Sequence, residues 1–149
     1  MFMHGSWFHI ISNMWFLIIF GDNVEDRLGR IQFVGFYLIC GLAAAAAQIA
    51  LNPSSTIPMV GASGAIGGVM GAYAILYPYA KVEMLVILGF FITRISVPAA
   101  LMLGYWFLLQ LLSASATFGS KVGGVAFGAH IGGFLMGIAL AYLFSFKQR

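Results

Sequence analysis

Long apolar runs with few charges between them dominate this chain, and they restrict its fold more than any other feature. Of its 149 residues, 62% are hydrophobic and 7% are charged, whereas soluble domains carry about 25% charged residues. Such a composition cannot supply the polar surface of a water-soluble protein. Because about 20 apolar residues in a helix cross a hydrocarbon core about 30 Å thick, the sequence predicts an all-α, polytopic membrane protein with one domain over residues 1–149.

Five apolar segments are expected to span the bilayer, with boundaries set by charges and turn residues. They are residues 6–20, 31–51, 58–77, 98–117 and 123–146. Residues 84–92 are also apolar, but a helix running from there through residue 116 would be about 50 Å long, which exceeds one upright span. We therefore expect residues 84–92 to lie at the membrane interface or in a loop.

The basic residues predict the orientation, because cytoplasmic loops are enriched in lysine and arginine. Six of the seven would lie on one side of the membrane, in the loops at 21–30 and 78–96 and in the C-terminal tail: Arg27, Arg30, Lys81, Arg94, Lys147 and Arg149. Lys121 would lie on the other side, with the loops at 52–57 and 118–122. The C-terminus is thus predicted to be cytoplasmic and the N-terminus to lie outside.

The first apolar segment is a weak signal for insertion into a membrane. Residues 6–20 are only 15 residues long, and His9 and Asn13 lie among them, whereas a span needs about 20 mainly apolar residues. We therefore expect the working protein to have a further helix and loop upstream of Met1.

Four polar residues are expected at the same depth near the outer surface. Ser63 and His130 lie about five and seven residues into the third and fifth segments, and His9 and Asn13 lie one helical turn apart in the first. A rise of 1.5 Å per residue places all four on the order of 5–10 Å below the interface. Because polar groups inside a membrane are costly and usually functional, the shared depth indicates one site.

Glycines flank both Ser63 and His130 at helical spacing, and they would allow the two helices to come close. The set is Gly61, Gly64, Gly67, Gly68, Gly71, Gly128, Gly132, Gly133 and Gly137. Small residues four apart let membrane helices pack backbone to backbone. That approach is required here, since a serine–histidine hydrogen bond needs heavy atoms about 2.6–3.2 Å apart.

A serine beside a histidine predicts acyl transfer by a nucleophile and a general base. Ser63 would attack a peptide carbonyl, and His130 would accept the hydroxyl proton and return it to the leaving amine. The acidic residues all fall in predicted cytoplasmic loops, so we expect a dyad in which packing or a neutral partner orients His130. N–H groups of His9, Asn13 and Ser63 would stabilise the oxyanion.

Each of these residues also has a purely structural interpretation. A serine or histidine in a membrane helix usually makes interhelical hydrogen bonds, and His9 with Asn13 would serve equally as a helix contact or cap. Gln48 and Gln110 are interpreted as interhelical hydrogen bonds. Three histidines are compatible with a metal site, but no acidic ligand is expected at the same depth, so we expect neither a metal nor a cofactor.

The chain resembles the rhomboid family of intramembrane serine proteases along essentially its whole length. The matching motifs are Gly61-Ala62-Ser63-Gly64, Ala129-His130-Ile131-Gly132-Gly133, residues 4–13, residues 21–26 and residues 106–110. The resemblance implies a bundle of six helices, of which the first is absent here together with most of the following loop. It implies these roles: Ser63 nucleophile, His130 base, His9 and Asn13 oxyanion donors, and His4, Gly61, Gly64, Gly68, Gly133 and Gly137 structural.

The resemblance also implies substrates and a location. The substrates would be transmembrane segments of other proteins, cut near the outer interface of a lipid bilayer such as the bacterial inner membrane. We expect no nucleic-acid partner, and the sequence does not define an oligomeric state. Gly67 stands where many members place an aromatic ring against the histidine, so we expect His130 to be held less firmly than in those members.

Three other interpretations compete with proteolysis. A non-catalytic rhomboid-like protein would bind membrane helices without cutting them, but it has no reason to keep both Ser63 and His130. An inactive, truncated fragment is the second. A small transporter, the third, would favour charged residues at the midplane or internal repeats, and the sequence has neither.

Overall fold

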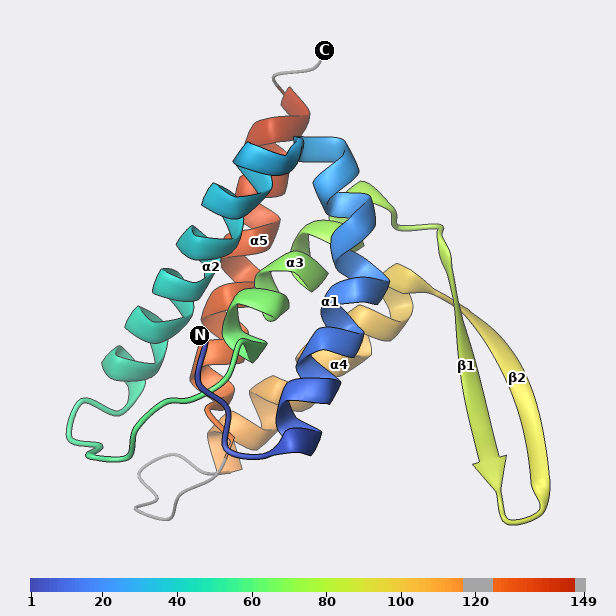
Figure 1. The fold of residues 1–149 in the computed structure, drawn as a ribbon, viewed down its shortest axis with the longest axis horizontal. Helices are drawn as coiled ribbons and strands as arrows, with labels where there is room; N and C mark the ends of the chain where they lie inside the picture. Colours follow the sequence, from blue (N-terminus) through green and yellow to red (C-terminus); the bar gives the residue numbers. More distant parts are fainter. Residues whose placement is uncertain (117–124, 147–149) are drawn as a thin grey trace.

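The computed structural model describes residues 1–116 and 125–146, and most of these residues are helical (Figure 1). The elements in chain order are α1 (Trp7–Leu28), α2 (Arg30–Leu51), α3 (Ser63–Leu76), β1 (Lys81–Leu88), β2 (Phe91–Pro98), α4 (Ala99–Ala116) and α5 (Phe127–Phe146). The predicted helical architecture is confirmed in this general form, with the addition of one β-hairpin.

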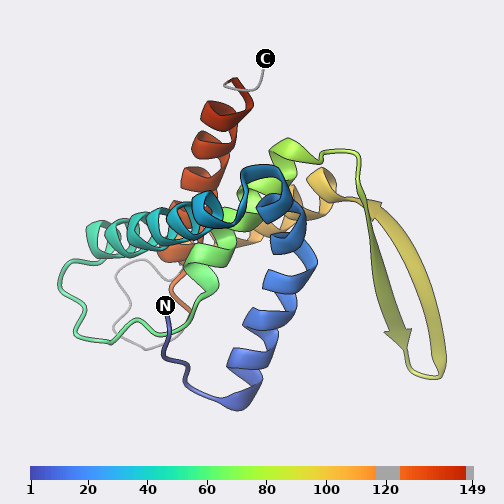
Figure 2. The ribbon, with the colours of Figure 1, turned by 45° about the horizontal axis from the view of Figure 1, so that its top comes forward.

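Helix α3 lies in the middle of the bundle and contacts α1, α2, α4 and α5 (Figures 1 and 2). Its most extensive packing is against α5. Helices α1, α3 and α5 all begin toward the lower side of Figure 1, where α2 and α4 end. Residues near the starts of α1, α3 and α5 therefore meet at one end of the bundle.

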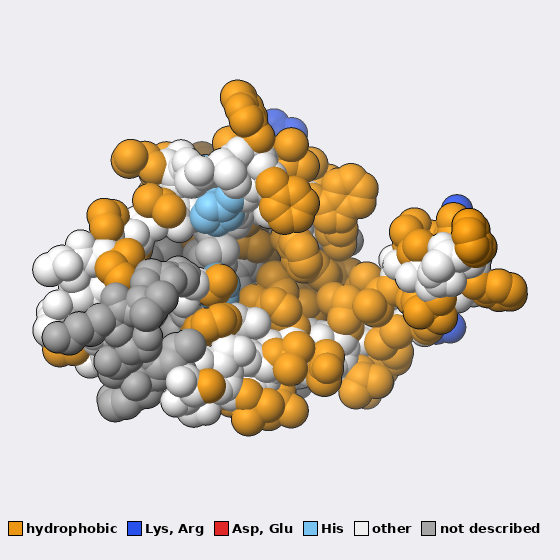
Figure 3. Space-filling view, turned by 90° about the horizontal axis from the view of Figure 1, so that it is seen from below, with side chains coloured by type: hydrophobic (Ala, Val, Ile, Leu, Met, Phe, Trp, Pro, Cys, Tyr) orange, Lys and Arg blue, Asp and Glu red, His pale blue; other side chains and the backbone are white. Residues whose placement is uncertain are grey.

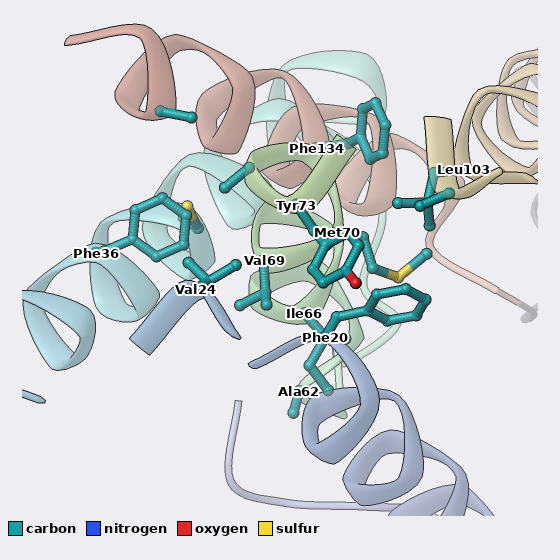
Figure 4. Close-up of a cluster of buried hydrophobic side chains, with 14 residues drawn as sticks. Phe20, Val24, Phe36, Ala62, Ile66, Val69, Met70, Tyr73, Leu103 and Phe134 are labelled. Atoms are coloured by element: carbon teal, nitrogen blue, oxygen red, sulfur yellow. The ribbon is translucent and has the colours of Figure 1, made fainter. Parts of the chain in front are cut away.

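The core consists of apolar side chains arranged around α3 (Figure 4). Every residue of α3 from Gly64 to Tyr73 is buried. Phe20 and Val24 of α1, Phe36 of α2 and Phe134 of α5 complete the surrounding layer. Because α3 is covered by neighbouring helices, its 14 residues need not match the bilayer thickness by themselves.

The segment at 21–30, predicted to be a loop, is helical instead. Helix α1 continues to Leu28, and only Gly29 separates it from α2. Val24 is fully buried, so apolar packing continues past the first charged residue and favours another turn of helix. Gly29 then reverses the chain with a φ of 86°, a conformation that glycine adopts without steric cost.

Residues 84–92, predicted to lie at the interface or in a loop, belong to an antiparallel hairpin. Strand β1 pairs with β2 in a register that runs from Lys81 opposite Pro98 to Leu88 opposite Phe91. The two-residue connection begins with Gly89 at a φ of 61°, which suits the first position of a type II′ turn. The hairpin stands apart from the helices (Figures 1 and 2) and exposes apolar side chains along both strands.

The outer surface of the bundle is apolar, as a lipid-facing surface would be. Exposed large side chains occur on all the longer helices, and Trp7, Ile31 and Leu101 are examples. Among the described residues, α2 and α4 have the length and hydropathy of membrane spans, whereas α3 and α5 count as shorter apolar helices. Helix α1 is long but carries four charged residues near its C-terminal end.

Candidate active site

Ser63 and His130 are in hydrogen-bond contact across two helices. The Oγ atom of Ser63 lies 2.8 Å from the Nε2 atom of His130. Ser63 is the first residue of α3, and His130 lies in the first turn of α5. The two residues are 67 positions apart in the chain, so the fold alone brings them together.

Ser63 lies at the start of its helix and not five residues into it, as the sequence predicted. Residues 58–62 are not helical. Gly61 has a φ of 107°, which is incompatible with an α-helix, and its N–H donates to the carbonyl of Met3 at 2.7 Å. Because the helix begins only at Ser63, the N–H groups of its first turn have no acceptor within the helix.

Glycines on both helices bring α3 and α5 into backbone contact. A Cβ atom added to Gly133 would collide with the carbonyl oxygen of Gly64, and one added to Gly137 would collide with that of Gly68. A Cβ atom at Gly71 would likewise meet the carbonyl oxygen of Phe134. Side chains at these positions would hold the helices apart, so the serine–histidine distance depends on the glycines.

The opposite nitrogen of the His130 ring contacts Gln110. The distance from Nδ1 of His130 to Oε1 of Gln110 is 2.8 Å. Gln110 belongs to α4 and is buried, with 9% of its surface exposed. The sequence indicated only an interhelical hydrogen bond for Gln110 and left open which neutral partner would orient His130.

Aromatic rings from two helices surround His130. The ring centroid of Trp106 lies 5.7 Å from that of His130, and that of Phe127 lies 6.5 Å away. A side chain at Gly67 would press against the carbonyl oxygen of His130, which is 3.1 Å from the position of a Cβ atom. Gly67 offers no ring to His130, which instead contacts Trp106, Phe127 and Gln110.

His9 and Asn13 lie on the first turns of α1, close to the Ser63 segment. A Cβ atom at Gly61 would be 2.7 Å from Nε2 of His9 and 3.8 Å from Oγ of Ser63. His9 therefore lies beside the residues that precede the serine, and Gly61 leaves room for its ring. Nδ1 of His9 accepts a long hydrogen bond of 3.5 Å from the N–H of Gly5, a contact that would leave Nε2 to carry the proton of a neutral ring.

Asn13 is buried, and its side-chain amide is already engaged within α1. Nδ2 of Asn13 donates to the carbonyl oxygen of His9 at 2.7 Å, and the Ser12 hydroxyl donates to the same oxygen at 3.1 Å. An amide nitrogen carries two N–H groups, and the bond to His9 uses one of them. The His4 ring packs edge to face against the His9 ring, with the ring centroids 5.1 Å apart.

A cleft of about 1210 Å³ opens at this end of the bundle. Ser63, His130, His9 and Asn13 all line it, and Figure 3 shows histidine side chains at the hollowed face. Much of the remaining wall is apolar, with Phe16, Met70 and Ile131 among its residues. Among the described residues, no three His, Cys, Asp or Glu side chains are grouped closely enough to hold a metal ion.

A Rhomboid domain model matches residues 1–147. The chain belongs to the rhomboid family. It is 32% identical over 148 residues to Rhomboid-like protein 11, chloroplastic, of Arabidopsis thaliana, covering 97% of this chain and 50% of that protein. It is 28% identical to Rhomboid protein 1, mitochondrial, of Saccharomyces cerevisiae, covering 97% of this chain and 40% of that protein.

Rhomboid-like protease 5 of Toxoplasma gondii is a third relative, 29% identical over 95% of this chain and 15% of its own length. The chain thus spans half or less of the curated relatives described here. Membership in the rhomboid family assigns the chain to membrane proteins, as the composition predicted. The family includes serine intramembrane proteases and also members named only as rhomboid-like.

Proposed function

We propose that this protein is an intramembrane serine endopeptidase that cuts transmembrane segments of other proteins. The observation that carries the proposal is the 2.8 Å contact between Ser63 Oγ and His130 Nε2, at the wall of an apolar cleft. A serine and a histidine joined only as helix packing would not need a cleft beside them. We propose that residues 1–149 form a single domain of the rhomboid type.

The reaction would proceed through an acyl-enzyme. Ser63 Oγ attacks the peptide carbonyl as its proton passes to Nε2 of His130, and the C–N bond then breaks as His130 gives that proton to the leaving amine. Water repeats the sequence: His130 takes one proton from it, the ester bond to Ser63 breaks, and the serine recovers its hydroxyl. Both halves pass through a tetrahedral oxyanion that needs donors.

Three groups would serve as these donors. They are the backbone N–H of Ser63 in the first turn of α3, Nε2–H of His9, and the second N–H of Asn13. The positive end of the α3 dipole adds to their effect. Because the cleft is largely apolar, each such hydrogen bond would be stronger than in water.

The proposal is tested with the purified protein in lipid and two readouts. A fluorophosphonate probe, followed by peptide mapping, should label Ser63, and a reporter with one transmembrane segment should be cut. A non-catalytic membrane-helix binder would bind the reporter but leave it intact, and the probe would not react with Ser63. That combination of results would reject the protease and favour the binder.

Asn13→Ala should slow cleavage by roughly 10–10³-fold without abolishing it, as loss of one oxyanion donor does. The matched control is Ser12→Ala, because Ser12 also donates to the His9 carbonyl but is not assigned an oxyanion role. Steady-state kinetics should show the loss in kcat. A raised KM with unchanged kcat would instead make Asn13 a substrate-binding residue.

We further propose a multi-pass membrane location, with five spans in this chain, the cleft open to the outer side and the C-terminus in the cytoplasm. Relatives are named as chloroplastic and mitochondrial, so we propose organellar membranes as well as the bacterial inner membrane.

The topology is tested with single cysteines that replace Asn23, Ser55 and Gln148 and are labelled with a membrane-impermeant thiol reagent. Position 55 should react from the outer side and positions 23 and 148 from the inner side; labelling of 55 and 148 from the same side would overturn this topology.

A further inference from the structure

We propose that Gln110 is a positioning residue that fixes the tautomer and the ring orientation of His130, acting as the neutral third member of the site. This inference rests on the proposed serine protease function. It concerns a residue of α4, a helix that contributes neither the nucleophile nor the base. Among the described residues, the buried polar side chains are Asn13, which lines the cleft, and Gln110, which contacts His130 in the cleft wall.

The orientation of the Gln110 amide follows from its second contact. Nε2 of Gln110 donates to the backbone carbonyl of Trp106, one turn earlier in α4, at 3.4 Å. A carbonyl oxygen can only accept a hydrogen bond, so the amide nitrogen must face Trp106. The amide oxygen is therefore the atom that faces His130, at 2.8 Å from Nδ1.

This orientation determines which ring nitrogen of His130 carries the proton. An amide oxygen has no proton to donate, so the hydrogen bond requires that Nδ1 of His130 be the donor. In the neutral ring the other nitrogen, Nε2, then has a free lone pair. That lone pair faces Oγ of Ser63 at 2.8 Å, which is the arrangement that a general base requires.

The Gln110 contact persists through the proton transfers. When Nε2 of His130 takes the serine proton, the imidazolium still donates from Nδ1 to the Gln110 oxygen. When Nε2 passes the proton to the leaving amine, the starting tautomer returns. A neutral amide supports this cycle without burying an anion, which would be costly in an apolar environment.

Trp106 also restrains the ring of His130. Its backbone carbonyl orients the Gln110 amide, and its side chain packs on His130 with ring centroids 5.7 Å apart. One turn of α4 thus limits both rotation and tilt of the imidazole. Helix α4 would position the base, whereas α3 and α5 would supply the reacting groups.

Gln110→Leu should lower kcat by about 10–10²-fold with little change in KM, because it leaves the Nδ1–H of His130 without its buried acceptor. Gln110→Glu should retain most of the parent activity. A protonated carboxyl can accept a hydrogen bond from Nδ1 of His130 and donate one to the Trp106 carbonyl. The matched control is Gln48→Leu. Gln48 also bonds α5, by accepting from the N–H of Ala129 at 3.2 Å, and its loss should lower thermal stability without changing the state of His130.

A direct readout is the tautomer of His130, measured by nitrogen-15 NMR of histidine-labelled protein in lipid and assigned with His130→Ala. The parent and the Glu variant should show a single Nδ1–H form, and the Leu variant should show a mixture. An unchanged tautomer in Gln110→Leu, with equal loss of activity and stability in both Gln110 variants, would reduce Gln110 to helix packing. If the parent fails to react with fluorophosphonate, the protease proposal fails, while the NMR result still decides the role of Gln110.

Discussion

Ser63→Ala should reduce cleavage of a reporter transmembrane segment by roughly 10⁵–10⁶-fold, and His130→Ala should reduce it by a similar factor. The reason is that the nucleophile and the base act as one unit through the contact between Oγ and Nε2. Removing either one ends covalent catalysis. The double variant should therefore be no slower than either single variant, and initial rates with purified protein in lipid would measure all three.

The same variants must remain folded for this result to be informative. Ser96→Ala is a matched control, because Ser96 lies on the exposed hairpin in β2, away from the cleft. It should cut the reporter as the parent does, and all variants should show similar thermal unfolding. Retained cleavage by Ser63→Ala would remove the proposed nucleophile, and additive losses in the double variant would show that Ser63 and His130 act separately.

The sequence predicted the helical character of the fold because each helix carries its own apolar signal. It also predicted that Ser63 and His130 would meet, since glycines on both segments permit close packing and both residues had a similar expected depth. An apolar run is recognised within one segment, and a shared depth is recognised by comparing two segments, so neither requires the three-dimensional structure. The structure places the two side chains together as a consequence of backbone contact between α3 and α5.

Features that depend on the chain's local reversals were not predicted correctly. The charges at residues 22–27 suggested a loop, but burial of Val24 carries α1 onward to Leu28. Residues 84–92 lack the alternation of a half-buried strand, because the hairpin exposes apolar groups on both faces. A fully apolar short run does not distinguish a strand from an interfacial segment, and Gly89 was the one available sign of a turn.

The partner of His130 could not be chosen from sequence because it depends on how α4 is rotated. Gln110 was noticed as a polar residue in an apolar run, but so was Gln48. The structure distinguishes them: Gln48 accepts from the backbone of α5, whereas Gln110 contacts the histidine ring itself. Such a choice between two similar residues requires the relative orientation of three helices.

Gly137→Ala should destabilise the protein strongly and separate the two reacting residues. A Cβ atom at Gly137 would overlap the carbonyl oxygen, the carbonyl carbon and the Cα atom of Gly68. These are backbone atoms of a central helix, so no side-chain rotation relieves the clash, and α5 must move away from α3. Overpacking of this kind typically costs about 1–3 kcal/mol and occasionally more; here the same displacement would also lengthen the distance from His130 to Ser63.

Gly104→Ala and Gly35→Ala provide matched controls within the same fold. Both glycines lie inside helices, and a Cβ atom at either would meet no other heavy atom within 4 Å. These variants should be neutral or slightly more stable, because alanine is the better helix former by about 1 kcal/mol. These variants and Gly137→Ala would be compared by thermal unfolding in lipid and by fluorophosphonate labelling of Ser63.

In Gly137→Ala the rate at which Ser63 is labelled should fall even at temperatures where the protein remains folded, since movement of α5 displaces the base. If Gly137→Ala instead unfolds and reacts like the two controls, α3 and α5 do not pack backbone to backbone, and the geometric basis for the Ser63–His130 contact is lost.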